Sequence, residues 1–331
     1  MTKIPDLYSV QMGTEDSDFG STVAPTVKLM GVTDWKIKPF VESAQADEVK
    51  GSLAPGYISN LQQVHGEASL SLLLGYDDAP YWLNGLFGKA TATADTEYTR
   101  AYTAPLNTYD SDLAAISIFD LVGAEASATT DAYTLSGGVL QKAVIKGETG
   151  APLTIDLDFI GKQVEQDEQD ATKTDRAVTF VMGDHVSLYI DPDTDAVGTT
   201  PIASTFFSFE LTLDTKRGLV YHLGALTPDG YRDAKWTGML KLVLEVNSTT
   251  KAYLDALLAA SGVPAKVVRI KAASGVNVLQ FDFNGVILKT PDIVTDKDGV
   301  ATYEFELTGQ YGTALGNWLS VTSVNTVSAL A

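Results

Sequence analysis

Paired carboxylates are the residues of this sequence whose types and spacing first suggest chemistry. Asp156 and Asp158 stand two positions apart, and Glu304 and Glu306 repeat the arrangement. Two carboxyl groups that face each other across a cleft can serve as acid and nucleophile in glycoside hydrolysis. Residues i and i+2 of a strand share one face instead, and a second pair fits a repeated surface better than one catalytic centre. The pairs therefore favour a charged sheet face over a glycosidase site.

Another acidic group, at Asp191, Asp193 and Asp195, has the spacing that opens a calcium-binding loop. Such a loop needs a glycine at its sharp turn and a bidentate glutamate at its end. Ala196 and Ile202 occupy those two positions. The segment is therefore predicted to be an acidic turn, and no metal ion is expected there.

The remaining residues form no recognisable catalytic centre. His65, His185 and His222 lie far apart in unrelated contexts, and the chain has no cysteine. It also lacks the nucleophile-elbow, phosphate-loop, dinucleotide-binding and zinc-protease motifs. We therefore expect a protein that is not an enzyme and needs no cofactor.

Alternation of apolar and polar residues dominates the chain and predicts strands with one apolar and one polar face. This pattern is typical of antiparallel sheets. It is clearest in the segments 69–74, 153–159, 207–213 and 303–308. The sequence Lys297-Asp298-Gly299 adds the signature of a tight hairpin turn.

Helix signals are few. Apolar residues at helical spacing predict one helix over 248–260 and a shorter one over 80–87. The candidate N-caps are Asn247 or Ser248 for the longer helix and Asp77 or Asp78 for the shorter one. The chain is thus expected to be mainly β.

An internal repeat emerges when Gly66 is aligned with Gly238. Without a gap, this alignment matches Leu70 with Leu242, Leu72 with Leu244, Leu74 with Val246, Tyr81 with Tyr253, Leu86 with Leu258, Trp35 with Phe207 and Ile37 with Phe209. After loops of unequal length, 138–140 matches 285–287 and 155–161 matches 303–309. Ordered matches of this kind predict two copies of one β-domain with a single helix. We assign residues 1–200 to the first domain, including a linker at about 163–200, and 201–331 to the second.

Polar stretches at 12–25, 40–64, 89–112 and 162–201 fall outside the repeat. Long irregular segments of a compact domain are usually functional or disordered. They are either flexible loops or arms that become ordered against neighbouring subunits, and we favour the arms.

The charge of the chain restricts its partners. With 42 acidic against 23 basic residues among 331, the formal net charge is −19. Since Lys and Arg make most contacts to phosphate, tight binding of DNA or RNA is not expected. No segment approaches the roughly 18 apolar residues of a membrane helix, and the N-terminus lacks a signal-peptide core. We expect a protein made in the cytoplasm, without membrane insertion, whose acidic surface repels phosphate.

The order of these segments resembles the major tail tube proteins of long-tailed bacteriophages, in particular the kind with two tandem domains. The resemblance is carried by 13–15, 19–21, 31–38, the strand starts 65–70 and 236–240 before each short helix, and the junction from 183–191 into the Phe/Ser-rich strand 202–209. It covers most of the chain as an ordered pattern.

For this chain the resemblance implies a β-sandwich or half-barrel domain, present twice, whose sheets join edge to edge into a β-barrel ring. Rings would stack into a hollow tube that conducts double-stranded DNA during ejection into the host cell. A trimeric ring with pseudo-sixfold symmetry is expected, and a hexameric ring with the second copy outside is the alternative. The implied partners are other copies of the chain, the tape measure protein and the tube initiator and terminator, in the tail of a virion assembled in the host cytoplasm.

The same resemblance assigns roles to particular residues. Acids on the polar strand faces would line the lumen: Asp156, Asp158, Glu210, Asp282, Glu304 and Glu306. The stretch 40–64 would form arms between subunits or rings, with Phe40, Tyr57, Ile58 and Asn60 as contact candidates. The competing function is a carbohydrate-binding or adhesin-like β-sandwich module, which needs Trp and Tyr side chains exposed together on one face. Trp35 falls at a core-facing position, and the facing of Trp82, Trp236 and Trp318 is left open.

Overall fold

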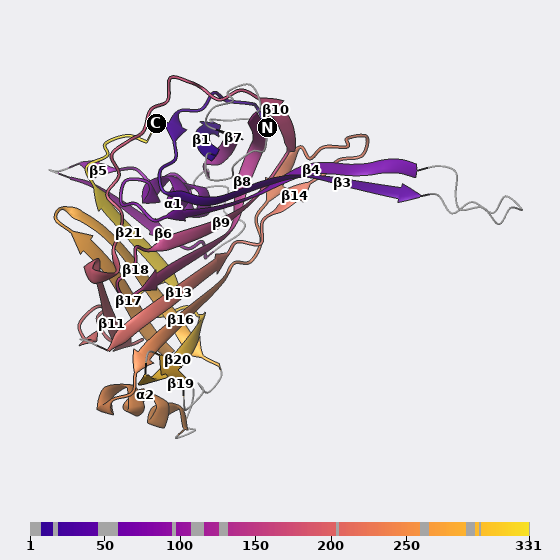
Figure 1. Ribbon diagram of the computed structural model, residues 1–331. Coiled ribbons are helices and arrows are strands. Elements are labelled where there is room, and N and C mark those ends of the chain that lie inside the picture. The colour runs from indigo at the N-terminus through magenta and orange to yellow at the C-terminus, as the bar shows by residue number, and fades with distance from the viewer. Residues whose placement is uncertain are drawn as a thin grey trace, which may run out of the picture.

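The computed structural model describes residues 8–15, 19–45, 59–94, 97–106, 116–125, 132–202, 205–258, 265–288, 295–297 and 299–330 (Figure 1). The elements of its first part are β1 (Tyr8–Glu15), β2 (Val27–Lys28), β3 (Val32–Gln45), β4 (Ser59–Leu73), α1 (Ala79–Phe87), β5 (Thr93–Ala94), β6 (Tyr98–Thr103), β7 (Ile118–Glu125), β8 (Ala132–Glu148), β9 (Thr154–Gly161) and β10 (Gln163–Asp167). Those of its second part are η2 (Gly183–His185), β11 (Val186–Pro192), β12 (Pro201–Ile202), β13 (Phe206–Asp214), β14 (Gly218–Val220), β15 (Gly230–Arg232), β16 (Thr237–Glu245), α2 (Ser248–Leu258), β17 (Ala265–Ser274), β18 (Asn277–Ile287), β19 (Thr295–Lys297), β20 (Val300–Gly309) and β21 (Leu319–Asn325). The predicted mainly β fold is confirmed.

One long antiparallel sheet contains strands from both parts of the chain. Its order is β3-β4-β9-β8-β13-β16-β20-β19. On β9, the apolar Ile155, Leu157 and Phe159 are buried, while Asp156 and Asp158 point to the other side. The alternation thus packs one face against the core and leaves the other face polar. We call this the main sheet.

Two further sets of strands complete a sandwich with the main sheet. β2, β1, β7, β8 and β10 pair in that order, and β12, β11, β17, β18, β21, β6 and β5 pair in a second series. β8 and β18 are long enough to join the main sheet at one end and a second layer at the other. Because both layers share these strands, their side chains bury one common core.

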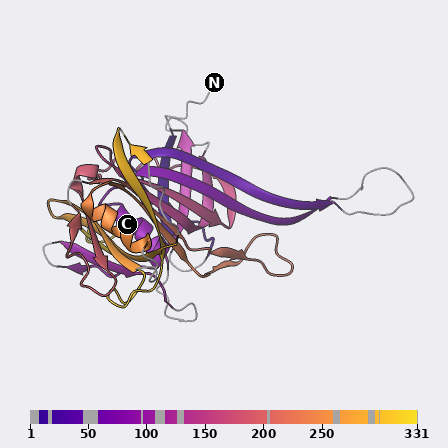
Figure 2. The ribbon, with the colours of Figure 1, turned by 90° about the horizontal axis from the view of Figure 1, so that it is seen from below.

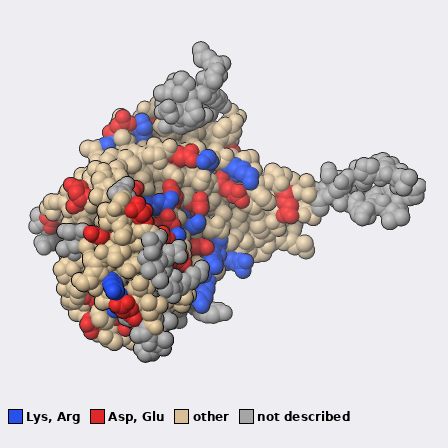
Figure 3. All heavy atoms as spheres, turned by 60° about the horizontal axis from the view of Figure 1, so that its bottom comes forward, with Lys and Arg blue, Asp and Glu red and all other residues tan. Residues whose placement is uncertain are grey.

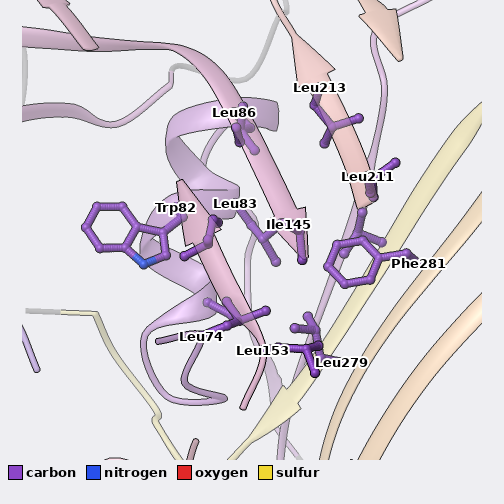
Figure 4. Packing of buried hydrophobic residues seen from close by; sticks show 14 of the residues in the cluster. Leu74, Trp82, Leu83, Leu86, Ile145, Leu153, Leu211, Leu213, Leu279 and Phe281 are labelled. Carbon is purple, nitrogen blue, oxygen red and sulfur yellow. The ribbon is translucent and has the colours of Figure 1, made fainter. Parts of the chain in front are cut away.

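That core spans both parts of the chain, from Val10 to Val321. Figure 4 shows part of this core, where Leu83 and Leu86 of α1 lie near Ile145 of β8, with Leu211 and Leu213 of β13 beyond them. Trp82 is 1% exposed, and its ring lies 5.9 Å from that of Phe119 and 6.4 Å from that of Phe159, between centroids. α1 is therefore a buried part of the core. The sequence alone had not shown which way Trp82 faces.

The same series of strand pairings occurs in both parts. The pairs β3–β4, β4–β9, β8–β9 and β7–β8 have counterparts in β13–β16, β16–β20, β18–β20 and β17–β18. The predicted match of Leu70 with Leu242 holds in register, because the former pairs with Leu157 and the latter with Phe305. The domain boundary at residue 200 stays a prediction, and β11, which precedes it, pairs with β17 beyond it.

Two matches of the repeat, Trp35 with Phe207 and Ile37 with Phe209, are wrong by two positions. Trp35 pairs with Leu70, and the residue that pairs with Leu242 is Phe209, not Phe207. Both strands have a bulge at their start, between Val32 and Asp34 and between Phe206 and Ser208. The gapless alignment fails here because the connection between the two strands differs in length in the two parts of the chain.

Parts of the polar stretches form strands within the chain itself. β1 occupies part of 12–25, β5 and β6 lie within 89–112, and β10, β11 and the start of β12 lie within 162–201. In 40–64, β3 and β4 continue as a hairpin that projects from the body of the molecule (Figures 1 and 2). The projecting ends of β3 and β4 escape the alternation rule because neither of their faces packs against the core.

Both predicted helices are present, with different capping. Asn247 caps α2, since its Oδ1 accepts hydrogen bonds from the N–H groups of Thr249 and Thr250 at 2.8 and 3.0 Å. Asp78 stands at the N-cap of α1 without a capping hydrogen bond. Its carboxylate is instead bound by the Arg176 guanidinium at 2.6 Å.

Candidate assembly surface

The polar face of the main sheet brings most of the predicted acids together. Asp156 and Asp158 on β9, Glu210 on β13, and Glu304 and Glu306 on β20 all point away from the core. Directly paired residues of antiparallel strands point to the same side, so the pairing registers place them on one surface. We call this surface the polar face.

Lysines stand between these acids. Across β8, β13, β16 and β20, the paired residues Lys146, Glu210, Lys241 and Glu306 form a row of alternating charge. Lys142 is paired with both Asp158 and, on its other side, Asp214. The polar face therefore carries both acids and lysines, because Lys142, Lys146 and Lys241 are each paired with an acid on a neighbouring strand. The sequence did contain a signal for lysines on this face, because Lys241 lies between the apolar residues Leu240 and Leu242.

The ion pairs of this face alter its acids. Lys146 Nζ and Ser71 Oγ each lie 2.7 Å from the Asp156 carboxylate. Burial would raise the pKa of Asp156, but these hydrogen bonds outweigh it, and the pKa lies below its ordinary value. Burial raises the pKa of Asp158, which Lys142 only partly offsets. The two neighbouring acids are structural partners of lysines, and their side chains do not face each other across a cleft.

The polar face is concave. Lys297 on β19 reaches Glu148 at 2.7 Å and Ser208 Oγ at 3.4 Å, although β20 and β16 separate β19 from β13, and β8 lies one strand further. Such a contact across the sheet requires it to curve toward its polar side. A hollow there is lined by residues that include Lys146, Glu210 and Glu304. On the side of the molecule drawn in Figure 3, acidic and basic side chains are intermixed.

Asp282 does not belong to this surface. It lies on the part of β18 that pairs with β17 and β21, outside the main sheet. Arg269 binds its carboxylate through Nε at 2.6 Å and Nη2 at 2.9 Å, and the side chain is only 9% exposed. The sequence grouped it with the others because it also alternates with buried residues, but alternation does not tell one layer from another.

The main sheet ends in two unpaired edges. Among the described strands, β3 pairs only with β4, and β19 pairs only with β20. Free edges present unpaired N–H and C=O groups, which readily accept another strand. Inside the chain, β8 and β13 form the joint at which the two parts of the sheet meet.

The hairpin of β3 and β4 is the second candidate surface for contacts between subunits. Phe40 stacks on His65 with ring centroids 4.3 Å apart, and His65 Nδ1 lies 2.9 Å from the hydroxyl of Tyr221. Val41 and Leu61 expose 58% and 43% of their surface. Asn60 lies in β4, where its backbone pairs with Ala44, and Tyr57 and Ile58 lie outside the described residues. We call the described residues 41–45 and 59–64 of this hairpin, which project from the body of the molecule, the arm.

A shorter hairpin, β14–β15, lies near the base of the arm (Figure 1). The N–H of Val64 donates to the carbonyl oxygen of Leu226 at 2.9 Å, which links the two hairpins. Leu223 and Leu226 are exposed. The sequence did not indicate this hairpin, because its strands are too short to show alternation.

The residues considered for chemistry have structural partners. Asp191 accepts hydrogen bonds from the N–H groups of Gly198, Thr199 and Thr200 and from the Thr199 hydroxyl, so its oxygens face donors and are not arranged for a cation. Within the described ranges, no group of His, Asp or Glu is arranged to hold a metal ion. His185 lies by Tyr76, and His222 pairs with Asp229 at 2.7 Å.

These features define a β-structural protein with open sheet edges and projecting hairpins. The chain belongs to the phage tail tube protein family, whose model matches residues 9–309. A search of curated proteins finds no match. Members of this family are structural proteins of the phage tail, and the chain is accordingly a component of that tail. Within the described part of the chain, no helix is long and apolar enough to span a membrane.

Proposed function

We propose that the chain polymerises into stacked rings that form the hollow phage tail tube and conduct the genome during ejection. The observation that carries this proposal is the β8–β13 joint between the two parts of the main sheet, with free edges left at β3 and β19. Repeating the joint between chains extends the sheet in one direction. Because the sheet is concave, the extension closes into a barrel.

The arrangement favours a trimeric, pseudo-sixfold ring. The second part of the chain continues the same sheet as the first, so both would line one barrel. In the alternative hexameric ring, the second part would decorate the outside and would not be expected to share the lumen sheet. The repeated strand pairings support two tandem tube domains, with their boundary near residue 200.

The polar face would line the lumen and carry Asp156, Asp158, Glu210, Glu304 and Glu306. Its lysines are engaged by acids, for example Lys146 by Asp156 and Lys241 by Glu304 at 3.7 Å. Lysines held in this way are less available to DNA phosphates, and the net charge of −19 adds repulsion. Such a lumen would let double-stranded DNA pass without sticking.

The arm would lock successive rings. The β8–β9 turn lies at the end of the main sheet opposite the arm, because Thr154 pairs with Leu73 whereas Gly161 pairs with Gly66 at the arm's base. A surface that protrudes at one end and contacts the other end of the next copy generates an open, head-to-tail stack. Exposed Val41 and Leu61, together with Phe40 and Asn60, are the described candidates for that contact.

Other expectations follow from membership of the tail. The partners would be further copies of this chain, the tape measure protein and the tube initiator and terminator, assembled in the host cytoplasm without membrane insertion. The competing carbohydrate-binding function is disfavoured by the tryptophans. Trp82 and Trp236 are buried, and Trp35 and Trp318 pack against the core.

Negative-stain electron microscopy of the purified chain across a concentration series tests this function. We expect rings or hollow tubes of uniform width, from which the number of chains per ring can be counted. Monomers that persist at high concentration and after long incubation would count against self-assembly into a tube.

A variant without the arm separates ring formation from stacking. Phe40 and His65 are directly paired, so residues 41–64 can be replaced by an Asn-Gly turn, which suits a two-residue hairpin. We expect single rings without long tubes. Tubes of ordinary length from this variant would show that the arm does not lock the rings.

A further inference from the structure

The joint inside the chain provides a residue-by-residue template for the joint between chains. β13 faces β8 with Ser208 opposite Glu148 and Glu210 opposite Lys146. On the free edge of β3, the positions that correspond to Ser208 and Glu210 are Asp34 and Lys36. The correspondence follows from register, since Asp34 pairs with Ser71 just after the bulge of β3, as Ser208 pairs with Val243 just after that of β13.

The other free edge can be matched to β8 in the same way. Lys146 pairs with Thr154 of β9, and Thr295 pairs with Thr302 of β20. Thr154 and Thr302 are equivalent because they pair with the last residues of β4 and β16, Leu73 and Glu245. Continuing along the strand, Lys297 of β19 stands where β8 has Glu148.

We propose that β3 of one chain pairs with β19 of a second copy in the register of the β8–β13 joint, which places Asp34 opposite Lys297 of the partner subunit. This proposal rests on the proposed function and adds the contact that closes each ring. Opposite charges that face each other across two strands stabilise their pairing. Both side chains reach the surface, Asp34 at 51% and Lys297 at 27% exposure, where Asp34 is paired with Lys36 of its own chain.

The charges also select which edge joins which. If β3 of another copy approached β8 in place of β13, Asp34 would face Glu148 and Lys36 would face Lys146. Both pairs are repulsive, whereas the joint inside the chain has Lys146 opposite Glu210. Like charges directly opposite each other disfavour pairing, and a mismatch of this kind is a known source of specificity. This selection keeps the first and second parts of the chains alternating around the ring, because the β3 edge of each chain accepts only the β19 edge of the next.

Lys297 has a partner within its own chain, Glu148 at 2.7 Å. Any test must therefore separate the loss of that contact from the loss of the joint between chains. The variant E148Q removes the charge of Glu148 and leaves both Asp34 and Lys297 in place. It is the matched control for changes at Lys297.

Charge reversal tests the selection. K297D and D34K should each raise the concentration at which rings appear by about tenfold, from the sizes of cross-strand charge effects. The double variant D34K/K297D restores opposite charges and should assemble near the original concentration, and E148Q should assemble like the unmodified chain. A double variant that assembles no better than either single variant would overturn the pairing of these residues.

Cross-linking tests the register independently of charge. Because the chain has no cysteine, the pair D34C/K297C can form a disulfide only between the introduced residues. We expect covalent oligomers under oxidation on a non-reducing gel, and few from the control K36C/K297C, which is shifted by two positions. Rings that cross-link through the control pair, or through neither pair, would overturn this register and leave the tube intact. Failure of the unmodified chain to form rings would instead overturn the proposed function itself.

Discussion

Two buried carboxyl groups, Glu15 and Asp120, lie side by side where β1, β7 and β8 meet. They are 2% and 0% exposed, and the N–H of Gly137 donates to both, at 2.9 and 3.1 Å. Burial, followed by the hydrogen bond with Glu15, raises the pKa of Asp120 to about 8 from 3.8, against opposing N–H donors such as that of Val23. The pair therefore holds a proton in the folded chain at neutral pH.

This proton links stability to pH. Between pH 4 and pH 8 the folded chain binds more protons at Asp120 than the unfolded chain does. The free energy of unfolding therefore falls as the pH rises through that window, by at most about 1.4 kcal/mol per pH unit from this site, and levels off above it. In D120N, which cannot ionise, this part of the slope should disappear.

Urea unfolding of the unassembled chain from pH 5 to pH 9 measures the effect. D170N serves as the control, because the side chain of Asp170 is 31% exposed and the pKa of its carboxyl is lowered chiefly by hydrogen bonds from Thr172. If D120N kept the slope of the unmodified chain, the shared proton would have to lie elsewhere.

Arg217, which lies between β13 and β14, binds the C-terminal end of α1. Its guanidinium binds Asp233 at 2.6 Å and donates to the carbonyl oxygens of Gly85 and Leu86, both at 2.7 Å, while only 3% exposed. It thus satisfies two carbonyl groups that a helix end leaves without partners. R217A would leave the two buried carbonyl groups and the partly exposed Asp233 without this partner, and should lower the free energy of unfolding by about 3 kcal/mol.

R217K and R232A are the comparisons for that measurement. Lysine keeps the charge but not the forked geometry, so R217K should fall between R217A and the unmodified chain. Arg232 is exposed on β15, and R232A should change stability by less than about 0.5 kcal/mol. Equal losses from R217A and R232A would contradict the role given to the buried guanidinium.

The two helices occupy different environments although their sequences match in the repeat. Nearly all of α1 is buried, whereas Leu258 at the end of α2 is 56% exposed. W82A should therefore cost about 3–5 kcal/mol of unfolding free energy, and L258A close to nothing in the unassembled chain. W82F should cost less than W82A, because the indole N–H of Trp82 has no hydrogen-bond partner to lose. Thermal unfolding of the three variants checks this order, and a mild effect of W82A would show that α1 is not required by the core.

Sequence patterns predict some strands of this fold and miss others. β4, β9, β13 and β20 were predicted from alternation, because the segments concerned have one buried and one more exposed face. The arm was not found as strands, because both of its faces leave the core and no apolar period marks them. The short pair β14–β15 was missed because three residues carry no period.

The alternation of residues within one strand also does not show on which surface of the molecule its acids lie. Glu304 and Asp282 each alternate with buried residues, but one lies in the main sheet and the other pairs with Arg269 in the second layer. Which layer a strand joins depends on its neighbours, which are distant in sequence. The lysines opposite the acids were overlooked for the same reason, although each points away from the core on its own strand.

At the scale of the molecule, the two repeated parts are not separate bodies. β13 pairs with β8, β21 pairs with β6, and one cluster of buried side chains includes residues from both parts. A chain of this kind gains stability from the joint that it contains, and the same type of joint is then available between chains. Fusion of two parts into one chain thus makes half of the joints in a ring intramolecular, which favours closure through effective concentration.

Dividing the chain tests that interdependence. We expect the fragment 204–331 alone not to fold stably, because β13, β17 and β21 would lose β8, β11 and β6, and apolar core surface would be exposed. Co-expressed with 1–203, it should form a complex that elutes as one species and unfolds in one transition. A chain with a protease site between residues 203 and 204, cleaved after folding, is the matched control and should remain associated. A cooperative unfolding transition of 204–331 by itself would show that the second part is an autonomous domain, and the joint inside the chain would then be a contact between finished domains.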